Sequence, residues 1–342
     1  MICNFMIFSE SVGSGAALST TLFNHLKSNT MTLIRKPNEI QIQGKIKMLI
    51  YGQPGMGKTT MALSAPDPLL IDCDNGVQRV NPAHISDTVQ VSSYNDVLAV
   101  LNEDLSPYKS LVIDTAGKLL DFIAAYVIAR NPKLGRANGA PTLQGYGEIK
   151  AEFSQFCKLV MSKDKHLIFV AHRQTRTEGD ETRYVPLFSG SNYDAVVTEL
   201  DLLGYIEANG NKRTITFNGT SRNDGKNTCN LPAMLDIPCV VDPATGNGLP
   251  NRFLSDAVIK AYNNHLSRLQ EQGHKYAAIM SQLKENIAAI TDDISANDFV
   301  DRIDTFDHVG ASKVAAGQLL SEKCRALKLT FNKTTRRYEQ GA

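Results

Sequence analysis

The sequence predicts an α/β fold with a mainly parallel sheet covered by helices, a late β-hairpin and a small C-terminal helical region. Two observations carry this prediction. Between about residues 40 and 220, short apolar runs alternate with helical stretches, which is typical of a sheet covered on both faces. A glycine-rich turn joins the first apolar run to the first helix. The length of 342 residues allows two domains or one core with an extension.

The predicted strands follow the short apolar runs, and Pro66 ends the first helix, which begins near Lys58. The clearest helix covers residues 148–161, where apolar side chains recur at helical spacing. After residue 180 we expect strands without intervening helices, with a hairpin turn at residues 209–211. The predicted strands are residues 46–51, 69–71, 88–91, 111–113, 167–171, 202–206 and 213–217.

Four segments are expected along the chain. Residues 1–30 are interpreted as a loose tail or an over-extended start before Met31, and residues 31–241 form the α/β core. The turn-rich stretch 242–251 is interpreted as a linker. Residues 252–342 form the helical region with a basic tail, and residues 295–298 resemble a capping box at the start of one of its helices.

Composition excludes several classes of protein. Hydrophobic residues make up 42% of the chain and charged residues 21%, which argues against a disordered or collagen-like protein. The net charge is only +1, so any nucleic-acid-binding surface must be local. The six cysteines form no C-x-x-C pair, which argues against a disulfide framework or a zinc site and fits a reducing cytoplasm. Without an apolar run long enough for a membrane span, we expect no membrane partner.

The strongest chemical signal is residues 52–59, GQPGMGKT, a full match to the phosphate-binding motif G-x-x-x-x-G-K-[ST] between a strand and a helix. The glycines let backbone N–H groups approach phosphate oxygens, and the helix N-terminus adds partial positive charge. Lys58 would bridge the β and γ phosphates of ATP, and the Thr59 hydroxyl would complete a Mg²⁺ shell. The candidate nucleotide-binding residues are Gly52, Gln53, Pro54, Gly55, Met56, Gly57, Lys58, Thr59 and Thr60.

Three further residues are candidates for the chemistry of ATP hydrolysis. Asp114 ends an apolar strand expected beside the phosphate-binding loop and would hold Mg²⁺ directly or through water. Asp72 and Asp74 follow the second strand, and Asp74 is the preferred group for orienting or deprotonating the attacking water. Both carboxylates could instead satisfy turn N–H groups. His172, at the end of the fifth strand, would read the γ phosphate or serve a structural role.

These motifs resemble the phage RecA-like P-loop ATPases of the recombinase and single-strand annealing type, often labelled phage nucleotide-binding proteins. The resemblance rests on KMLIYGQPGMGKTTMALSAPDPLLIDCDNG, SLVIDTAGKLLDF, LQGYGEIKAEFSQFCKLV, HLIFVAHRQ and SRNDGKNTCNLP, in this order. It implies a RecA-like core, ATP with Mg²⁺, a homo-oligomeric ring or filament on single-stranded DNA, and a bacterial cytoplasm as the location. A phage or host single-strand binding protein is a further implied partner. These ATPases typically carry glutamate where Asp74 stands, which puts strong hydrolysis in doubt.

Contacts with DNA are expected in two loops and at the C-terminal end. Residues 131–147 supply Lys133, Arg136 and Tyr146, the last as a stacking ring. The loop after the fifth strand supplies Arg173 and Arg176, although nearby acidic residues balance them. The C-terminal end carries six basic residues, namely Lys323, Arg325, Lys328, Lys333, Arg336 and Arg337.

Arg222 and Lys226 are candidates for a cation that a neighbouring subunit supplies to the γ phosphate, and Lys226 is preferred. A solvated turn is the alternative interpretation of this segment.

The function predicted from the sequence is an ATPase of phage DNA recombination or annealing that assembles on single strands. Two alternatives stay open. One is a nucleotide-gated DNA-binding or loading factor with little hydrolysis, and the other is a small-molecule P-loop kinase. The kinase is disfavoured because no arginine-rich lid is evident in the sequence.

Overall fold

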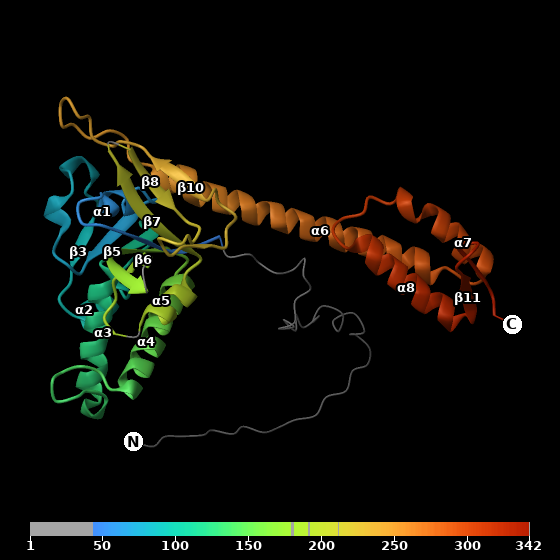
Figure 1. The fold of residues 1–342 in the computed structure, drawn as a ribbon, viewed down its shortest axis with the longest axis horizontal. Coiled ribbons are helices and arrows are strands. Elements are labelled where there is room, and N and C mark those ends of the chain that lie inside the picture. The colour runs from blue at the N-terminus through green and yellow to red at the C-terminus, as the bar shows by residue number, and fades with distance from the viewer. Residues whose placement is uncertain (1–43, 179–180, 191, 211, 342) are drawn as a thin grey trace, which may run out of the picture. The chain divides into compact units, whose positions relative to one another are not determined.

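The computed structural model describes residues 44–341 except 179–180, 191 and 211 (Figure 1). The predicted tail over residues 1–30 and the start at Met31 lie outside the described residues. No helix in the described part of the chain is long and apolar enough to cross a membrane.

The structure confirms the RecA-like α/β fold with a mainly parallel sheet. Along its main path the sheet has the order β10-β8-β7-β1-β5-β4-β2-β3, with parallel pairing from β7 to β3 and antiparallel pairing of β7, β8 and β10. The predicted hairpin is present, with Asn209 opposite Lys212. The strands are β1 (Lys47–Gly52), β2 (Pro68–Asp72), β3 (Thr88–Gln90), β4 (Ser110–Asp114), β5 (His166–Glu178), β6 (Glu181–Pro186), β7 (Leu202–Asn209), β8 (Lys212–Thr216), β9 (Lys226–Asn227) and β10 (Met234–Ile237).

Alternate side chains of the strands enter two cores, because neighbouring residues of a strand point to opposite faces. On β1, Leu49 and Tyr51 belong to one core, and Met48 and Ile50 to the other. The first core also contains apolar residues of four helices, α2 (Tyr94–Val100), α3 (Ala116–Arg130), α4 (Leu143–Ser162) and α5 (Tyr193–Glu199). The second contains residues of α1 (Lys58–Ala62) and of the π-helical segment Leu254–Ile259.

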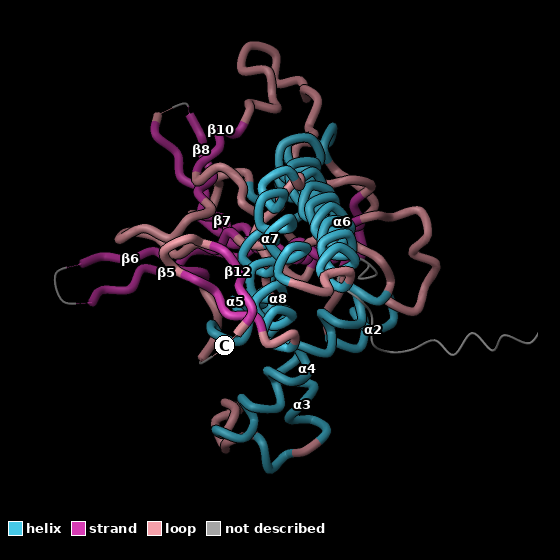
Figure 2. Tube along the Cα trace, turned by 90° about the vertical axis from the view of Figure 1, so that its right-hand side faces the viewer, coloured by secondary structure: helices cyan, strands magenta, loops and turns pink. Residues whose placement is uncertain are grey.

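Two parts of the prediction after the fourth strand are wrong. Strand β5 does not end near Ala171 but continues to Glu178 and pairs with β6, so that a hairpin projects from the sheet (Figure 2). Its outer half carries polar residues that a search for apolar runs overlooks. The short helix α5 then lies between β6 and β7, where no helix was expected.

Strand β4 is not a direct neighbour of β1. Strand β5 lies between them, with Lys47–Gly52 of β1 in register with residues 167–172 and Ser110–Asp114 of β4 in register with residues 166–170. His172, on β5, is therefore level with Gly52 and two residues past the partner of Asp114.

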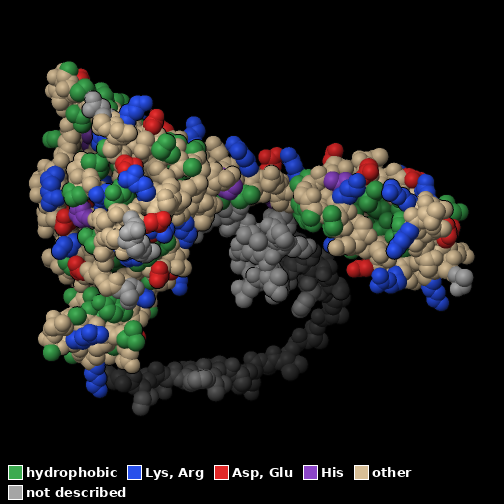
Figure 3. All heavy atoms as spheres, viewed as in Figure 1, with side chains coloured by type: hydrophobic (Ala, Val, Ile, Leu, Met, Phe, Trp, Pro, Cys, Tyr) green, Lys and Arg blue, Asp and Glu red, His purple; other side chains and the backbone are tan. Residues whose placement is uncertain are grey.

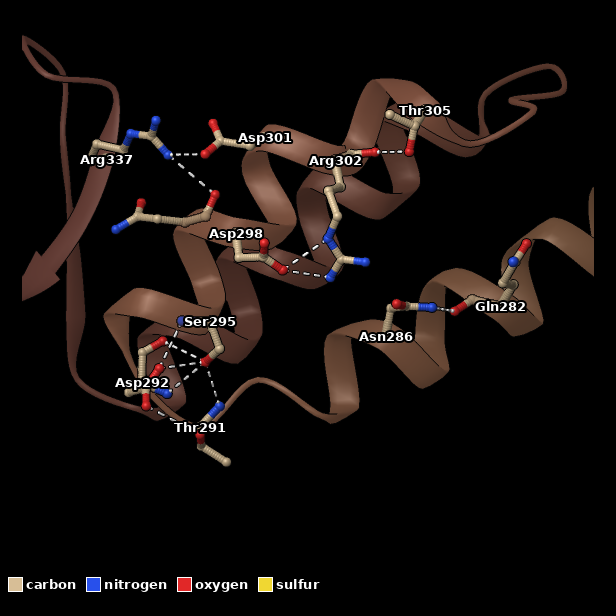
Figure 4. Close-up of polar contacts among 11 residues, drawn as sticks. Gln282, Asn286, Thr291, Asp292, Ser295, Asp298, Asp301, Arg302, Thr305 and Arg337 are labelled. Carbon is tan, nitrogen blue, oxygen red and sulfur yellow. Dashed lines mark hydrogen bonds and ion pairs between the residues drawn. The ribbon is translucent and has the colours of Figure 1, made fainter.

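The C-terminal region has its own small core. It is built from α6 (Lys260–Ala288), α7 (Asp293–Arg302), α8 (Ser312–Ala326) and the hairpin β11 (Leu329–Asn332) and β12 (Arg337–Gln340). The capping box is one turn earlier than predicted. The Asp292 carboxylate accepts a hydrogen bond from the Ser295 N–H at 2.8 Å, while the Ser295 hydroxyl accepts one from the Asp292 N–H at 3.1 Å (Figure 4). Asp298, within α7, instead pairs with Arg302 one turn later.

The stretch predicted as a linker, residues 242–251, is exposed from residue 243 to residue 250 and is tied to the core at its end. The Asn251 Nδ2 group donates a 2.6 Å hydrogen bond to the carbonyl of Thr60, on α1. Phe253, Leu254 and Val258 follow as buried members of the second core. The chain thus packs on the second core as far as Tyr262, beyond the predicted start of the helical region at residue 252.

Candidate functional site

The loop after β1 has the backbone shape that its glycines allow. Gly55 and Gly57 have φ values of 79° and 78°, in the left-handed region that side chains disfavour. A Cβ at Gly57 would lie 2.7 Å from an Arg213 guanidinium nitrogen. Lys58 begins α1, is buried, and donates from its ammonium to the carbonyl of Gln53 at 2.7 Å. The lysine thus lies folded over the loop that would hold phosphates.

Thr59 and Asp114 meet across the sheet edge. The Thr59 hydroxyl donates to Asp114 Oδ2 at 2.5 Å. Burial raises the pKa of Asp114, and the Thr59 hydrogen bond opposes that rise. Burial lowers the pKa of Lys58, and the charge of Asp114 opposes that fall. A hydroxyl and a half-buried carboxylate are oxygen donors of the kind that Mg²⁺ prefers.

Asp72 and Asp74 have different surroundings, which the sequence left open. Asp72 is 1% exposed and accepts N–H hydrogen bonds from Asp74, Gly76 and Val77 at 3.0 to 3.3 Å. Asp72 therefore shapes the turn. The backbone N–H of Asp74 donates to the carbonyl of Asp114 at 3.2 Å, and its carboxylate lines the same cleft as Lys58.

His172 lines this cleft from the central strand β5. Its Nδ1 atom is buried and has no hydrogen-bond partner among the described residues. Burial and then the charge of Lys58 lower the pKa of the imidazole, which favours the neutral ring. A buried nitrogen without a partner is costly unless a bound group or water satisfies it. His172 lines the cleft and is therefore placed to contact a bound group.

The phosphate cleft is a hollow of about 210 Å³ lined by Lys58, Thr59, Asp74, Asp114 and His172 together. The sequence reasoning missed one further cation there. Arg79 follows the Asp74 turn in the 3₁₀ segment Val77–Arg79 and lines the cleft. No motif marks it, and only its position five residues after the proposed base could have drawn attention to it.

The candidate DNA residues of the α3–α4 connection are separated in the structure. Lys133 and Arg136 lie at the tip between the two helices, where Lys and Arg side chains are visible on the surface (Figure 3). Tyr146 does not lie in a loop. It belongs to the first turn of α4, packs against the first core, and lies so close to Gly190 that a Cβ there would overlap the ring. Tyr146 is therefore a half-buried residue of a helix, and its role as a stacking ring stays a prediction.

Arg173 and Arg176 lie on the β5–β6 hairpin, and both are already placed against aromatic rings. The Arg173 guanidinium lies 4.0 Å from the Tyr184 ring centre, and that of Arg176 lies 4.9 Å from the Tyr193 ring centre. Arg176 is directly opposite Arg183 across the hairpin. Arg176 and Arg183 line a polar cleft of about 350 Å³. Asp224 lines the same cleft and forms an ion pair with Arg183 at 2.6 Å.

Lys226 and Arg222, the candidates for a cation supplied to a neighbouring subunit, differ in how their side chains are bonded. The Lys226 ammonium donates to the carbonyls of Val197 and Thr198 at the end of α5, at 2.9 and 3.2 Å. It thereby satisfies a helix C-terminus. Arg222 is exposed, with its guanidinium 5.9 Å from the Tyr184 ring centre. Arg222 is thus the more exposed of the two side chains, and the role of either residue at a neighbouring subunit stays a prediction.

Comparisons with known proteins locate the family-level similarity in the first two thirds of the chain. A family model described as "AAA domain" matches residues 44–229. No curated protein matches the chain. A solved structure of an ATPase domain is similar with a TM-score of 0.37 and 12% identity, covering 61% of this chain and 85% of that one.

Proposed function

The chain belongs to the AAA domain family of P-loop ATPases, and from this premise we propose that it binds ATP with Mg²⁺ and hydrolyses it to control assembly on single-stranded DNA. The observation that carries the proposal is the phosphate cleft. It brings Lys58 and Thr59 of α1 together with Asp74, Asp114 and His172 from the ends of β2 and β4 and from β5. The finer expectation, a role in phage-type recombination or single-strand annealing, rests on the resemblance of the motifs.

The binding step uses the charges of the loop. Lys58 exchanges its contact with the Gln53 carbonyl for the β and γ phosphates, and backbone N–H groups at the start of α1 face the same oxygens. Thr59 and Asp114 would hold Mg²⁺, which neutralises phosphate charge when bound. Asp114, which accepts the Thr59 hydrogen bond, would hold the ion directly or through a water molecule.

Asp74 is proposed to act on water. The water oxygen forms a bond to the γ phosphorus, the bond from phosphorus to the bridging oxygen breaks, ADP leaves, and the water proton passes to the Asp74 carboxylate. Asp72 positions this residue by holding the turn through three N–H groups. Neutral His172 and the Arg79 cation are proposed to contact the γ phosphate. Because Arg79 belongs to the same chain, some turnover without a neighbouring subunit is expected.

Single-stranded DNA is proposed to contact the α3–α4 tip and the β5–β6 hairpin. Lys133 and Arg136 supply the positive charge at the tip. On the hairpin, Arg176 and Arg183 are directly opposite each other, an arrangement that is unfavourable unless an anion or a carboxylate lies nearby. Asp224 neutralises one of the two. A phosphate of a nucleic acid would neutralise the other, in the cleft beside them.

Steady-state ATP hydrolysis with and without single-stranded DNA tests the proposal. Stimulation by DNA supports an ATPase that assembles on single strands. ATP binding without turnover would favour a nucleotide-gated DNA-binding factor instead. Turnover that ignores DNA and transfers phosphate to a small molecule would favour a kinase.

A further inference from the structure

A second hollow adjoins the phosphate cleft at the start of α1. Gly57 and Thr60 line both hollows, so both lie beside the same two residues. The second hollow measures about 80 Å³, and it is here called the apolar hollow. Its walls include five apolar residues that follow β7 in the sequence, namely Ile237, Pro238, Val240, Val241 and Phe253.

These five residues belong to a segment that contacts the core at several points. On β10, Ile237 is directly opposite Arg213 of β8. The carbonyl of Val240 accepts a hydrogen bond from the Leu249 N–H at 2.8 Å and lies 2.7 Å from the His84 ring nitrogen. Asn251 then anchors the segment to the Thr60 carbonyl. The five residues all lie past residue 229, where the family match ends.

Arg213 stands where the apolar hollow meets the phosphate-binding loop. Its guanidinium donates to the Met56 carbonyl at 3.3 Å, and the residue is half-buried. A planar guanidinium stacks on aromatic rings and attracts negative charge, so this position suits a group that joins a flat ring to a phosphate chain.

We propose that the apolar hollow receives the base of the nucleotide whose phosphates occupy the phosphate cleft. This inference rests on the proposed function, because it places the other end of the same ligand. A nucleoside triphosphate is a phosphate chain linked through a sugar to a flat ring, and the two hollows offer a charged and an apolar space that share Gly57 and Thr60. The ring packs on Val241 and Phe253, with Arg213 over the sugar-phosphate end. The segment after residue 229 thus completes the nucleotide site.

The test compares ATP with inorganic tripolyphosphate, which has the phosphate chain but no base. Val241→Asp places a carboxylate on the wall of the hollow, where the residue is half-buried. Met234→Asp, on β10, adds the same charge at a position that is 58% exposed and does not line the hollow. A milder variant, Val241→Thr, keeps the shape and adds only a hydroxyl. Dissociation constants for both ligands are measured by calorimetry in Mg²⁺.

We expect the unmodified protein to bind ATP more tightly than tripolyphosphate. Val241→Asp should weaken ATP binding about tenfold or more and leave tripolyphosphate binding unchanged, because a ring in the hollow would remove water from the new carboxylate. Val241→Thr should show a smaller loss of the same kind, and Met234→Asp none. Equal affinity of the unmodified protein for the two ligands, or an unchanged ratio in both Val241 variants, would overturn the inference and leave the phosphate site intact. Failure of the unmodified protein to bind either ligand would overturn the proposed function as well.

Discussion

The Thr59 hydroxyl donates a 2.5 Å hydrogen bond to the Asp114 carboxylate across 55 positions of sequence. The two side chains come from the start of α1 and the end of β4, and β5 separates β4 from the strand that leads into α1. This bond holds the two proposed Mg²⁺ ligands side by side. The fold therefore brings both oxygen donors to one place at the edge of the sheet.

The first prediction concerns this pair. Thr59→Val and Asp114→Asn should each weaken ATP binding in Mg²⁺ about tenfold or more, since hydrogen bonds to charged groups contribute roughly 1.5 to 3 kcal/mol. ATP binding in EDTA should change little. The double variant should lose no more than the worse single one, because the two residues act on one ion. Independent, additive losses in calorimetric titrations would contradict a shared ion.

The second prediction separates Asp74 from Asp72. Asp74→Asn should keep ATP affinity and reduce hydrolysis by orders of magnitude, because only the proton acceptor is lost. Asp74→Glu should raise turnover by lengthening the reach toward water. Asp72→Asn should instead lower the free energy of unfolding by about 2 to 4 kcal/mol, since it weakens three partly buried hydrogen bonds to a charged group. Urea unfolding and phosphate-release assays check both. Equal effects of the two asparagine variants on binding and rate would refute the division of roles.

The third prediction concerns DNA. Replacing Lys133 and Arg136 with glutamine should weaken single-strand binding and reduce its salt slope by up to about two. The matched control replaces Lys109 and Lys158, which lie before β4 and in the last turns of α4, away from the tip. Fluorescence anisotropy at several salt concentrations gives both slopes. An unchanged slope for the tip variant would remove the tip from the DNA surface.

The fourth prediction concerns pH and stability. His166 accepts a hydrogen bond from the Ile46 N–H at its Nδ1 atom, and burial, assisted by Lys45 and opposed by Asp164, lowers its pKa to about 4. The unfolded chain therefore binds more protons between about pH 6.5 and 4, so stability should fall as pH falls through this range, by up to about 3 kcal/mol. His166→Asn, which keeps an acceptor, should flatten that dependence. Urea midpoints at about pH 7.5 and 5, on either side of the unfolded pKa, measure it. Parallel losses in both proteins would argue against His166 as the source.

The sheet and the phosphate-binding loop could be predicted from the sequence because both have strong local patterns. Apolar strands and the G-x-x-x-x-G-K-T motif are each defined by residues close together in the chain. The structure contains the predicted strands, and Lys58 lies over the loop that precedes it. The contacts that could not be predicted depend on distant partners. Tyr146 packs on Gly190, Lys226 holds the end of α5, and Arg213 reaches the loop across 157 positions of sequence. Contacts between residues so far apart in the chain produce no recognisable motif in the sequence.

The central claim is that the loop beginning at Gly52 binds the phosphates of ATP through Lys58, and titration of the unmodified protein and Lys58→Ala with ATP in Mg²⁺ tests it most directly. The account predicts that the unmodified protein binds ATP and unfolds at a higher temperature in its presence, because a ligand stabilises the state that binds it. Lys58→Ala should fold with the same circular dichroism spectrum, bind ATP at least about tenfold more weakly and show no such thermal shift. Equal ATP affinity in the two proteins would contradict the account.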